Sequence, residues 1–150
     1  MSSTTVPPAA AILGFAGLVP FVLPSIALWL APSVYAPFLN AVLIAYGLAI
    51  ASFVGGVQWG FGILGEMAAD RTWRVLALSV APALIAWVGA LTPFPWPFAF
   101  LMVAFALVLR VDFRLVRDGL APRWYPVLRG PLTAGVLVCL AGALIHALTR

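Results

Sequence analysis

Long apolar stretches, interrupted by short clusters of proline or charge, make up almost the whole chain. No charged side chain occurs before Glu66, so proline is the first sign of an interruption. The segment 31–37 contains two prolines and a tyrosine, a composition typical of a turn at a membrane surface. It separates a first predicted helix, near residues 10–31, from a second, near residues 38–65. At about 1.5 Å of rise per residue, each is long enough to cross a hydrocarbon core of about 30 Å.

Three further spans follow the charged segment 66–74. Residues 75–109 carry no charge, which is too long a run for one ordinary helix, and the proline-rich segment 92–98 divides it. A last uncharged run begins near Pro131, which suits the first turn of a helix. The pattern therefore predicts spans near residues 74–92, 97–115 and 130–149.

Composition places these helices in a membrane. Of the 150 residues, 65% are hydrophobic and only 8% are charged, whereas a soluble domain carries about 25% charged residues. A surface that poor in charge must face the lipid bilayer. We expect residues 1–150 to form one all-α transmembrane domain, a polytopic bundle of about five helices. The opening residues lack the features of a removable targeting peptide, so the first span is expected to be retained.

The arginines predict how the chain is oriented. With five spans, seven of the eight basic residues fall on the side of the N-terminus, and only Arg150 falls on the other. The positive-inside rule then places the N-terminus in the cytoplasm and the C-terminus outside. This arrangement explains the net charge of +4, and no basic face interleaved with aromatic residues indicates a nucleic-acid partner.

Small residues recur along the second predicted span at helical spacing. Gly47, Ala51 and Gly55 are four residues apart, and Gly56 and Gly60 repeat this spacing on a neighbouring stripe. Such stripes let helix backbones approach closely in lipid. We expect them to pack within the bundle, with contact to another subunit as the alternative. In the first span, Pro20 and Pro24 should kink the helix and free backbone carbonyls for a neighbour.

Ionisable residues that could support catalysis are scarce. Charges at the end of the fourth span, including Asp112 and a possible Arg114–Asp118 pair, are expected to form a solvated helix end. The alternative is a cytoplasmic site for lipid headgroups or a partner, formed by Arg110, Arg114, Arg117, Arg123, Trp124, Tyr125 and Arg129. His146 is expected at the membrane surface, and Cys139 in an apolar helix. We predict no enzyme activity, no cofactor and no metal site, because no set of catalytic or ligating residues can be assembled.

Gln58 is the most informative polar residue within a span. An amide in this environment needs a hydrogen-bond partner, either on another helix or on a ligand. Ser52 and Trp59 lie beside it in the same glycine-rich segment. If a ligand binds, a pocket bounded by Gln58, Trp59 and Pro82 is its expected location.

Seven segments of the chain, which begin with residues 14–21 and include the glycine-rich residues 52–60, resemble a known family. It is the bacterial domain of unknown function 3429, whose mitochondrial relatives are called transmembrane protein 69. The family often has a basic residue or histidine where this chain has Gln58. The resemblance implies a five-span protein of the bacterial inner membrane, and it brings no established activity, cofactor or catalytic residue. The residues that carry it are 14–21, 46–47, 52–60, 79–82, 122–125, 128–129 and 131–133.

Two functions remain open from the sequence. The first is an accessory, structural or assembly subunit bound to a larger membrane complex, such as a respiratory or photosynthetic one, because packing surface is abundant and reactive groups are few. The second is a binding or transport protein for a tetrapyrrole-like or lipid-like molecule. That second hypothesis rests on an outline, of size and number of spans, similar to the tryptophan-rich sensory proteins.

Overall fold

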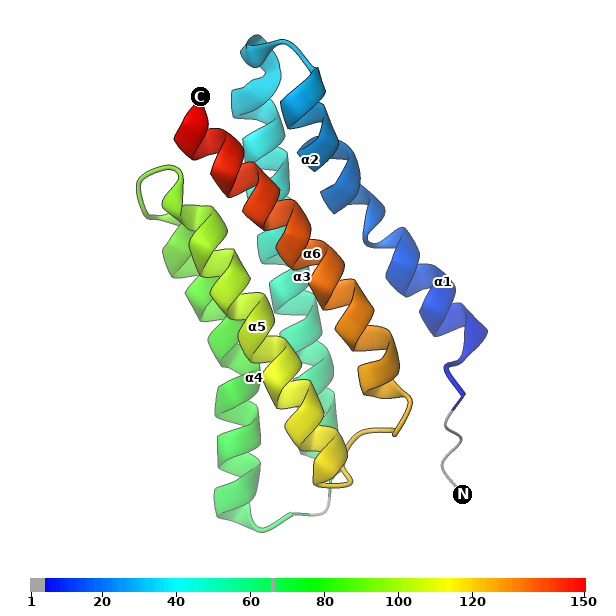
Figure 1. Cartoon of the computed structure of the whole chain (residues 1–150). Coiled ribbons are helices and arrows are strands. Elements are labelled where there is room, and N and C mark those ends of the chain that lie inside the picture. The colour runs from blue at the N-terminus through cyan, green and yellow to red at the C-terminus, as the bar shows by residue number, and fades with distance from the viewer. Residues whose placement is uncertain (1–4, 66) are drawn as a thin grey trace.

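The computed structural model describes residues 5–65 and 67–150, which form a bundle of long helices that run up and down in turn (Figure 1). Glu66, expected at the end of a span, lies outside the described residues. The elements in chain order are α1 (Pro8–Ala16), α2 (Val19–Leu30), the short 3₁₀ helix η1 (Ser33–Tyr35), α3 (Ala36–Leu64), α4 (Ala69–Ala90), α5 (Trp96–Arg117) and α6 (Tyr125–Thr149).

The predicted all-helical bundle of about five long segments is confirmed, with α1 and α2 together forming the first. Four segments are long and apolar enough to cross a membrane. They are Pro8–Leu30, Ser33–Leu64, Ala69–Ala90 and Tyr125–Thr149. Helix α5 has the same length as α4, 22 residues, and packs against α3, α4 and α6. It therefore runs through the same layer as its neighbours.

Prolines mark where most of the helices begin. A proline lacks the N–H that would be unpaired at the first helical positions, and its fixed φ suits the first turn. The prediction for Pro131 is wrong, because it lies inside α6, which begins at Tyr125. The prolines at the first or second helical position of α1, α2, α3, α5 and α6 are Pro8, Pro20, Pro37, Pro97 and Pro126.

Two helices extend beyond the apolar runs that predicted them. Helix α4 begins at Ala69 rather than near residue 74, and α6 begins at Tyr125 rather than near residue 130. Charged side chains end a hydrophobic run without ending a helix, and an acidic residue such as Asp70 is stabilised in a first turn. The end of an apolar run therefore indicates where the helix leaves the lipid, and both α4 and α6 extend beyond that point.

The first span is broken next to Pro20, as predicted, whereas Pro24 lies inside α2 and does not end that helix. The ring of Pro20 would clash with the carbonyl of Ala16 in a continuous helix, and α1 ends at Ala16. The break frees the carbonyl of Gly17, which accepts a hydrogen bond of 2.8 Å from the Tyr46 hydroxyl of α3. Tyr46 therefore attaches the broken span to the longest helix of the bundle.

Removing that hydroxyl should loosen the first span. In Tyr46→Phe we expect the free energy of unfolding to fall by about 0.5–1.5 kcal/mol, the usual contribution of one hydrogen bond. Titration of dodecyl maltoside micelles with sodium dodecyl sulfate measures this change. The control is Tyr35→Phe, at an exposed tyrosine of η1, and equal losses in the two variants would contradict the assignment.

The core lies between the helices and the apolar surface lies outside them. Helix α3 contacts α2, α4 and α5, and α6 contacts α2 and α5, so the helices close around a shared interior. Large side chains fill it, among them Phe21, Leu43, Phe98, Leu101, Phe105 and Leu140. Other large apolar residues point outward, such as Leu64 and Trp73, which are 84% and 76% exposed. In water this surface would be costly, and in a bilayer it is the lipid-facing surface.

Candidate functional site

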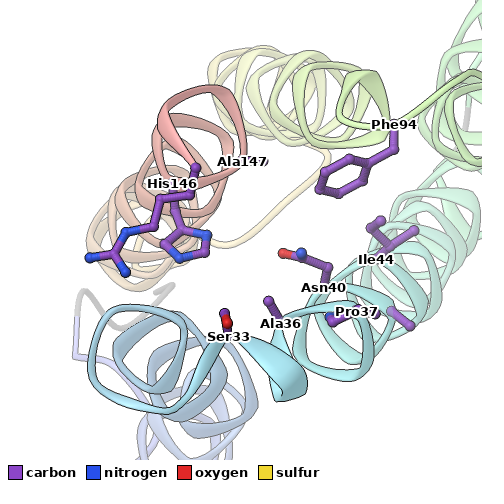
Figure 2. Close-up of a pocket in the computed structure, with 10 residues that line it drawn as sticks. Ser33, Ala36, Pro37, Asn40, Ile44, Phe94, His146 and Ala147 are labelled. Carbon is purple, nitrogen blue, oxygen red and sulfur yellow. The ribbon is translucent and has the colours of Figure 1, made fainter.

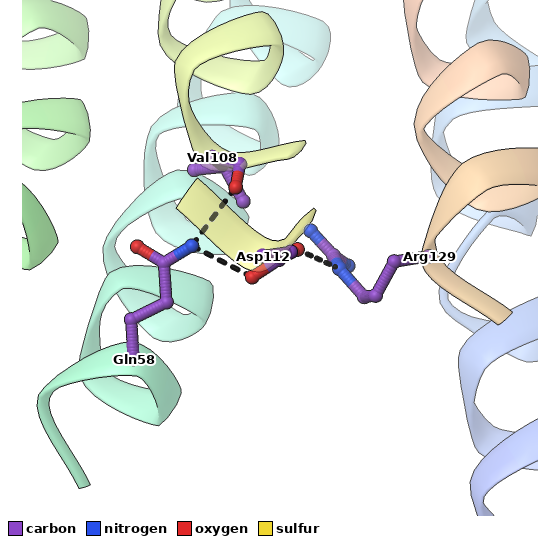
Figure 3. Close-up of polar contacts among 4 residues, drawn as sticks. All are labelled: Gln58, Val108, Asp112 and Arg129. Carbon is purple, nitrogen blue, oxygen red and sulfur yellow. Dashed lines mark hydrogen bonds and ion pairs between the residues drawn. The ribbon is translucent and has the colours of Figure 1, made fainter. Parts of the chain in front are cut away.

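A cluster of buried polar side chains joins three helices near the end of the bundle that carries most of the arginines (Figure 3). Gln58 of α3 and Asp112 of α5 are both fully buried. The Gln58 Nε2 donates to Asp112 Oδ1 at 2.7 Å and to the carbonyl of Val108 at 2.9 Å. The Arg129 Nε of α6 donates to Asp112 Oδ2 at 3.0 Å. Both carboxylate oxygens of Asp112 are therefore bound.

Helical periodicity explains why these three side chains meet. Asp112 lies one turn after Val108 and three residues before Leu115, both of them buried. Gln58 continues the buried face of Val54 and Ala51 at steps of four and seven residues. Arg129 lies one turn after the buried Tyr125 of α6, with its side chain only 12% exposed. Each polar group replaces an apolar residue on an inward face.

The cluster is neutral overall, which suits its environment. A carboxylate and a guanidinium that pair directly avoid most of the penalty of an isolated charge in a medium of low polarity. Gln58 connects a third helix, α3, to this ion pair through its hydrogen bond to Asp112. The carboxylate is fully buried and has both oxygens occupied, so Asp112 joins α5 to both α3 and α6.

Part of the cluster faces a small, partly open recess between the helices. Arg129 and Thr133 line a space of about 120 Å³ that is otherwise bounded mainly by apolar residues of α1, α2, α3, α5 and α6. Arg129 Nη2 and Thr133 Oγ1 have no hydrogen-bond partner among residues 5–65 and 67–150. At about 30 Å³ per molecule, the space has room for a few waters that could solvate both atoms.

Three expectations about the charged residues of α5 and α6 are corrected by this geometry. Asp112 was expected in a solvated helix end, and Arg129 was expected to contact lipid or a partner in the cytoplasm. Both side chains instead point into the bundle, because the helical face decides their direction. Asp118 pairs with Arg71 of α4 at 2.9 Å, in place of the expected Arg114. That ion pair links the α4 start to the α5 end.

The other residues of the predicted cytoplasmic contact are divided between the surface and the core. Tyr125 is buried, with its ring edge-on to Phe61 at 5.4 Å, and Trp124 is half-buried. Three arginines lie on one outer face of α5, beside an open groove of about 750 Å³ that Phe113 and Leu137 also line. These are Arg110, Arg114 and Arg117, and Arg123 is also exposed. A contact with lipid headgroups or a partner stays a prediction for these exposed arginines.

The small residues of α3 face in two directions. Gly47 lies against Leu101 of α5, Ala51 is fully buried, and Gly55 lies against the carbonyl oxygen of Ser79 in α4. Gly56 and Gly60 do not pack within the bundle, because a Cβ built at either would meet no described heavy atom within 4 Å. They are one residue and five residues beyond Gly55, which turns them to the outer side of α3.

The expected ligand pocket at Gln58, Trp59 and Pro82 is not formed. Gln58 points inward to α5, whereas Trp59 is 41% exposed on the outer face. Pro82 is buried. The hydroxyl of Ser52 donates to the carbonyl of Leu48 in its own helix and is exposed. Neighbouring residues on a helix point about 100° apart, and here Gln58 turns to α5 while Trp59 turns outward.

His146 lies near the end of α6, as expected for a residue close to the membrane surface, but its side chain is enclosed by the bundle. It is only 6% exposed, and its ring lies edge-on to Trp29 with the centroids 5.2 Å apart. Cys139, on the same helix, is half-buried. Within the described part of the chain, no group of three or more histidine, cysteine or acidic residues lies close enough to hold a metal ion.

These features define a multi-pass membrane protein whose helices are joined by a buried polar cluster. The family described as Protein of unknown function (DUF3429) matches residues 6–145, and the chain belongs to it. Transmembrane protein 69 of Xenopus tropicalis is 36% identical over 140 residues, which cover 93% of this chain and 55% of that protein. The Mus musculus protein of the same name is 29% identical over 123 residues, 82% of this chain and 50% of its own length. The chain thus spans about half the length of these relatives, and no solved structure matches it.

Proposed function

We propose that this protein is a non-catalytic accessory or assembly subunit of a larger complex in the bacterial inner membrane, of the respiratory or photosynthetic kind. The observation that carries the proposal is a row of small residues on the outer face of α3. Ser52, Gly56 and Gly60 follow one another at four-residue steps on this side, and the two glycines meet no other part of the described chain. We call these three residues the outer stripe.

A stripe of this kind suits close contact with another membrane helix. Small residues at four-residue spacing let two backbones approach, and in lipid this packing is a main source of helix association. Lipid chains fill such a groove less completely than a complementary helix does. Phe53 and Trp59 flank the outer stripe and are 67% and 41% exposed, so a partner helix would also cover aromatic surface. The partner we propose is an apolar transmembrane helix of another subunit.

The orientation proposed for the protein follows from its two ends. The start of α1, the end of α3, the start of α4 and the α5–α6 connection lie at one end of the bundle, and the C-terminal residue lies at the other (Figure 1). The arginines of the first end support its placement in the cytoplasm. Within the membrane, the ion pair Asp112–Arg129 is enclosed, which supports a role in helix orientation rather than in catalysis.

Filling the outer stripe should release the partner and leave the fold unchanged. In Gly56→Leu we expect loss of comigration with the larger complex, because the side chain would occupy the space needed for the opposing helix. Native electrophoresis of membranes solubilised in a mild detergent measures this. The matched control is Gly130→Leu in α6, where a Cβ also meets no described atom within 4 Å. A wild-type protein that migrates alone, or equal behaviour of the two variants, would contradict the proposal.

A further inference from the structure

A second, larger cavity lies at the other end of the bundle, away from the arginine-rich connections (Figure 2). Its volume is about 540 Å³, within the range of small-molecule sites. Most of its wall is apolar, including Ile44 of α3, Phe94 of the α4–α5 turn and Ala147 of α6. Two buried polar side chains, Asn40 of α3 and His146 of α6, enter this wall, and the exposed Ser33 and Arg150 also line the cavity.

Asn40 and His146 are buried and lack partners. They are 8% and 6% exposed. Asn40 Oδ1 and His146 Nδ1 have no hydrogen-bond partner in the part of the chain that the structure describes. A buried polar atom left unpaired destabilises a fold by about 1–3 kcal/mol. Both side chains point into the same hollow from opposite sides (Figure 2), so a single occupant can supply hydrogen bonds to both.

The polar atoms of the cavity lie near the end of the bundle, at a membrane depth that suits the polar end of an amphipathic molecule. Asn40 is the fifth residue of α3, about 6 Å from the start of that helix. Ser33 of η1 lies at the rim, and Trp29 packs against His146. Tryptophan is typical of the boundary between headgroups and acyl chains. The polar atoms therefore lie where a lipid-soluble molecule carries its polar end.

We propose that this cavity binds a neutral, lipid-soluble molecule through a hydroxyl group placed between Asn40 and His146. A hydroxyl donates its proton to Asn40 Oδ1, and its oxygen accepts from His146 in the tautomer that carries the proton on Nδ1, so one group satisfies both atoms. A carboxylate or a quinone offers only acceptors and leaves the Asn40 oxygen unpaired. The apolar body of the molecule lies against Ile44 and Phe94. Long-chain alcohols, diacylglycerols and quinols share this chemistry, and the site is independent of the outer stripe.

Photolabelling with a 16-carbon alcohol that carries a diazirine tests the proposal. The full chain is placed in phosphatidylcholine nanodiscs, irradiated with the probe and mapped by mass spectrometry. We expect label near Asn40 and His146, and we expect the methyl ether of the same probe to label less. Loss of one neutral hydrogen bond should weaken labelling about threefold to tenfold in Asn40→Leu and in His146→Phe. Thr149→Val, an exposed position of the same helix end that bonds only to its own helix, is the matched control.

Stability provides a second readout that separates ligand loss from misfolding. Because Asn40→Leu removes an unpaired polar atom, the ligand-free variant should be at least as stable as the wild type. Competition by a decyl-substituted hydroquinone would assign the natural occupant to quinols, and competition by diacylglycerol would assign it to neutral lipids. Equal labelling by the alcohol and its methyl ether would overturn the proposal. Unchanged labelling of a folded Asn40→Leu would also overturn it, as would the absence of label in this cavity.

Discussion

Gly55→Ala should strongly destabilise the bundle, although it adds a single methyl group to a helix. A Cβ at this position would meet the carbonyl oxygen of Ser79 far inside van der Waals contact. That oxygen belongs to the backbone of α4, which cannot move aside as a side chain does. Overpacking of this kind costs about 1–3 kcal/mol. The free energy of unfolding of the variant, measured in detergent micelles, should fall by that amount.

The neighbouring glycine provides the control for this prediction. Gly56→Ala adds the same methyl group to the same helix, into open space. Alanine favours a helix over glycine by up to about 1 kcal/mol, so this variant should be as stable as the wild type or more so. Gly119 would be a poor control, because its φ of 75° strains any other residue. Equal stability of the two alanine variants would contradict the close contact between α3 and α4.

Asp112→Leu should have the largest effect among single changes in the buried cluster. It leaves the guanidinium of Arg129 without its carboxylate and removes one acceptor from Gln58. Breaking one side of a buried ion pair costs about 3–5 kcal/mol. We expect most of the protein to be degraded or unfolded in the membrane, and chemical denaturation of any purified variant should show the loss directly.

A double variant separates the ion pair from simple packing. Asp112→Leu combined with Arg129→Met removes both charges, and replacing a buried pair with apolar residues is often neutral or stabilising. The double variant should therefore recover most of the stability that Asp112→Leu loses. The control is Arg110→Met on the outer face of α5, which should change stability by less than about 0.5 kcal/mol. If the double variant is as unstable as Asp112→Leu, the charges are not the reason for the loss.

The spans could be predicted from the sequence because an apolar run long enough to cross a bilayer predicts a transmembrane helix. Breaks were also readable, since Pro20 marks the end of α1 and the prolines near residues 92–98 mark the α4–α5 turn. The positions of the helix ends were harder to predict from the sequence. The start of α6 at Tyr125 lies outside its predicted apolar run, because Arg129 interrupts the apolar sequence after the first turn of the helix.

The buried cluster was only half visible in the sequence. Gln58 stood out because an amide is unusual within an apolar span. Asp112 did not, because it lies between the exposed Arg110 and Arg114, and Arg129 did not, because it ends an apolar run as a surface arginine also would. Their positions on an inward face, one turn from Val108 and Tyr125 respectively, were the signal that could have separated them. The cavity at Asn40 and His146 was not predictable, since it joins residues 106 positions apart through tertiary packing alone.

We propose that the inner face of α3 packs within the bundle and that the outer stripe binds a partner helix. The adjacent glycines Gly55 and Gly56 give the most direct test of this division. The measurement is native electrophoresis of solubilised membranes from cells that produce Gly56→Leu, with unfolding of the same purified variant measured in parallel. We expect a normally folded bundle that no longer comigrates with its complex. A Gly56→Leu protein that keeps its place in the complex, or that unfolds as readily as Gly55→Ala, would contradict this division.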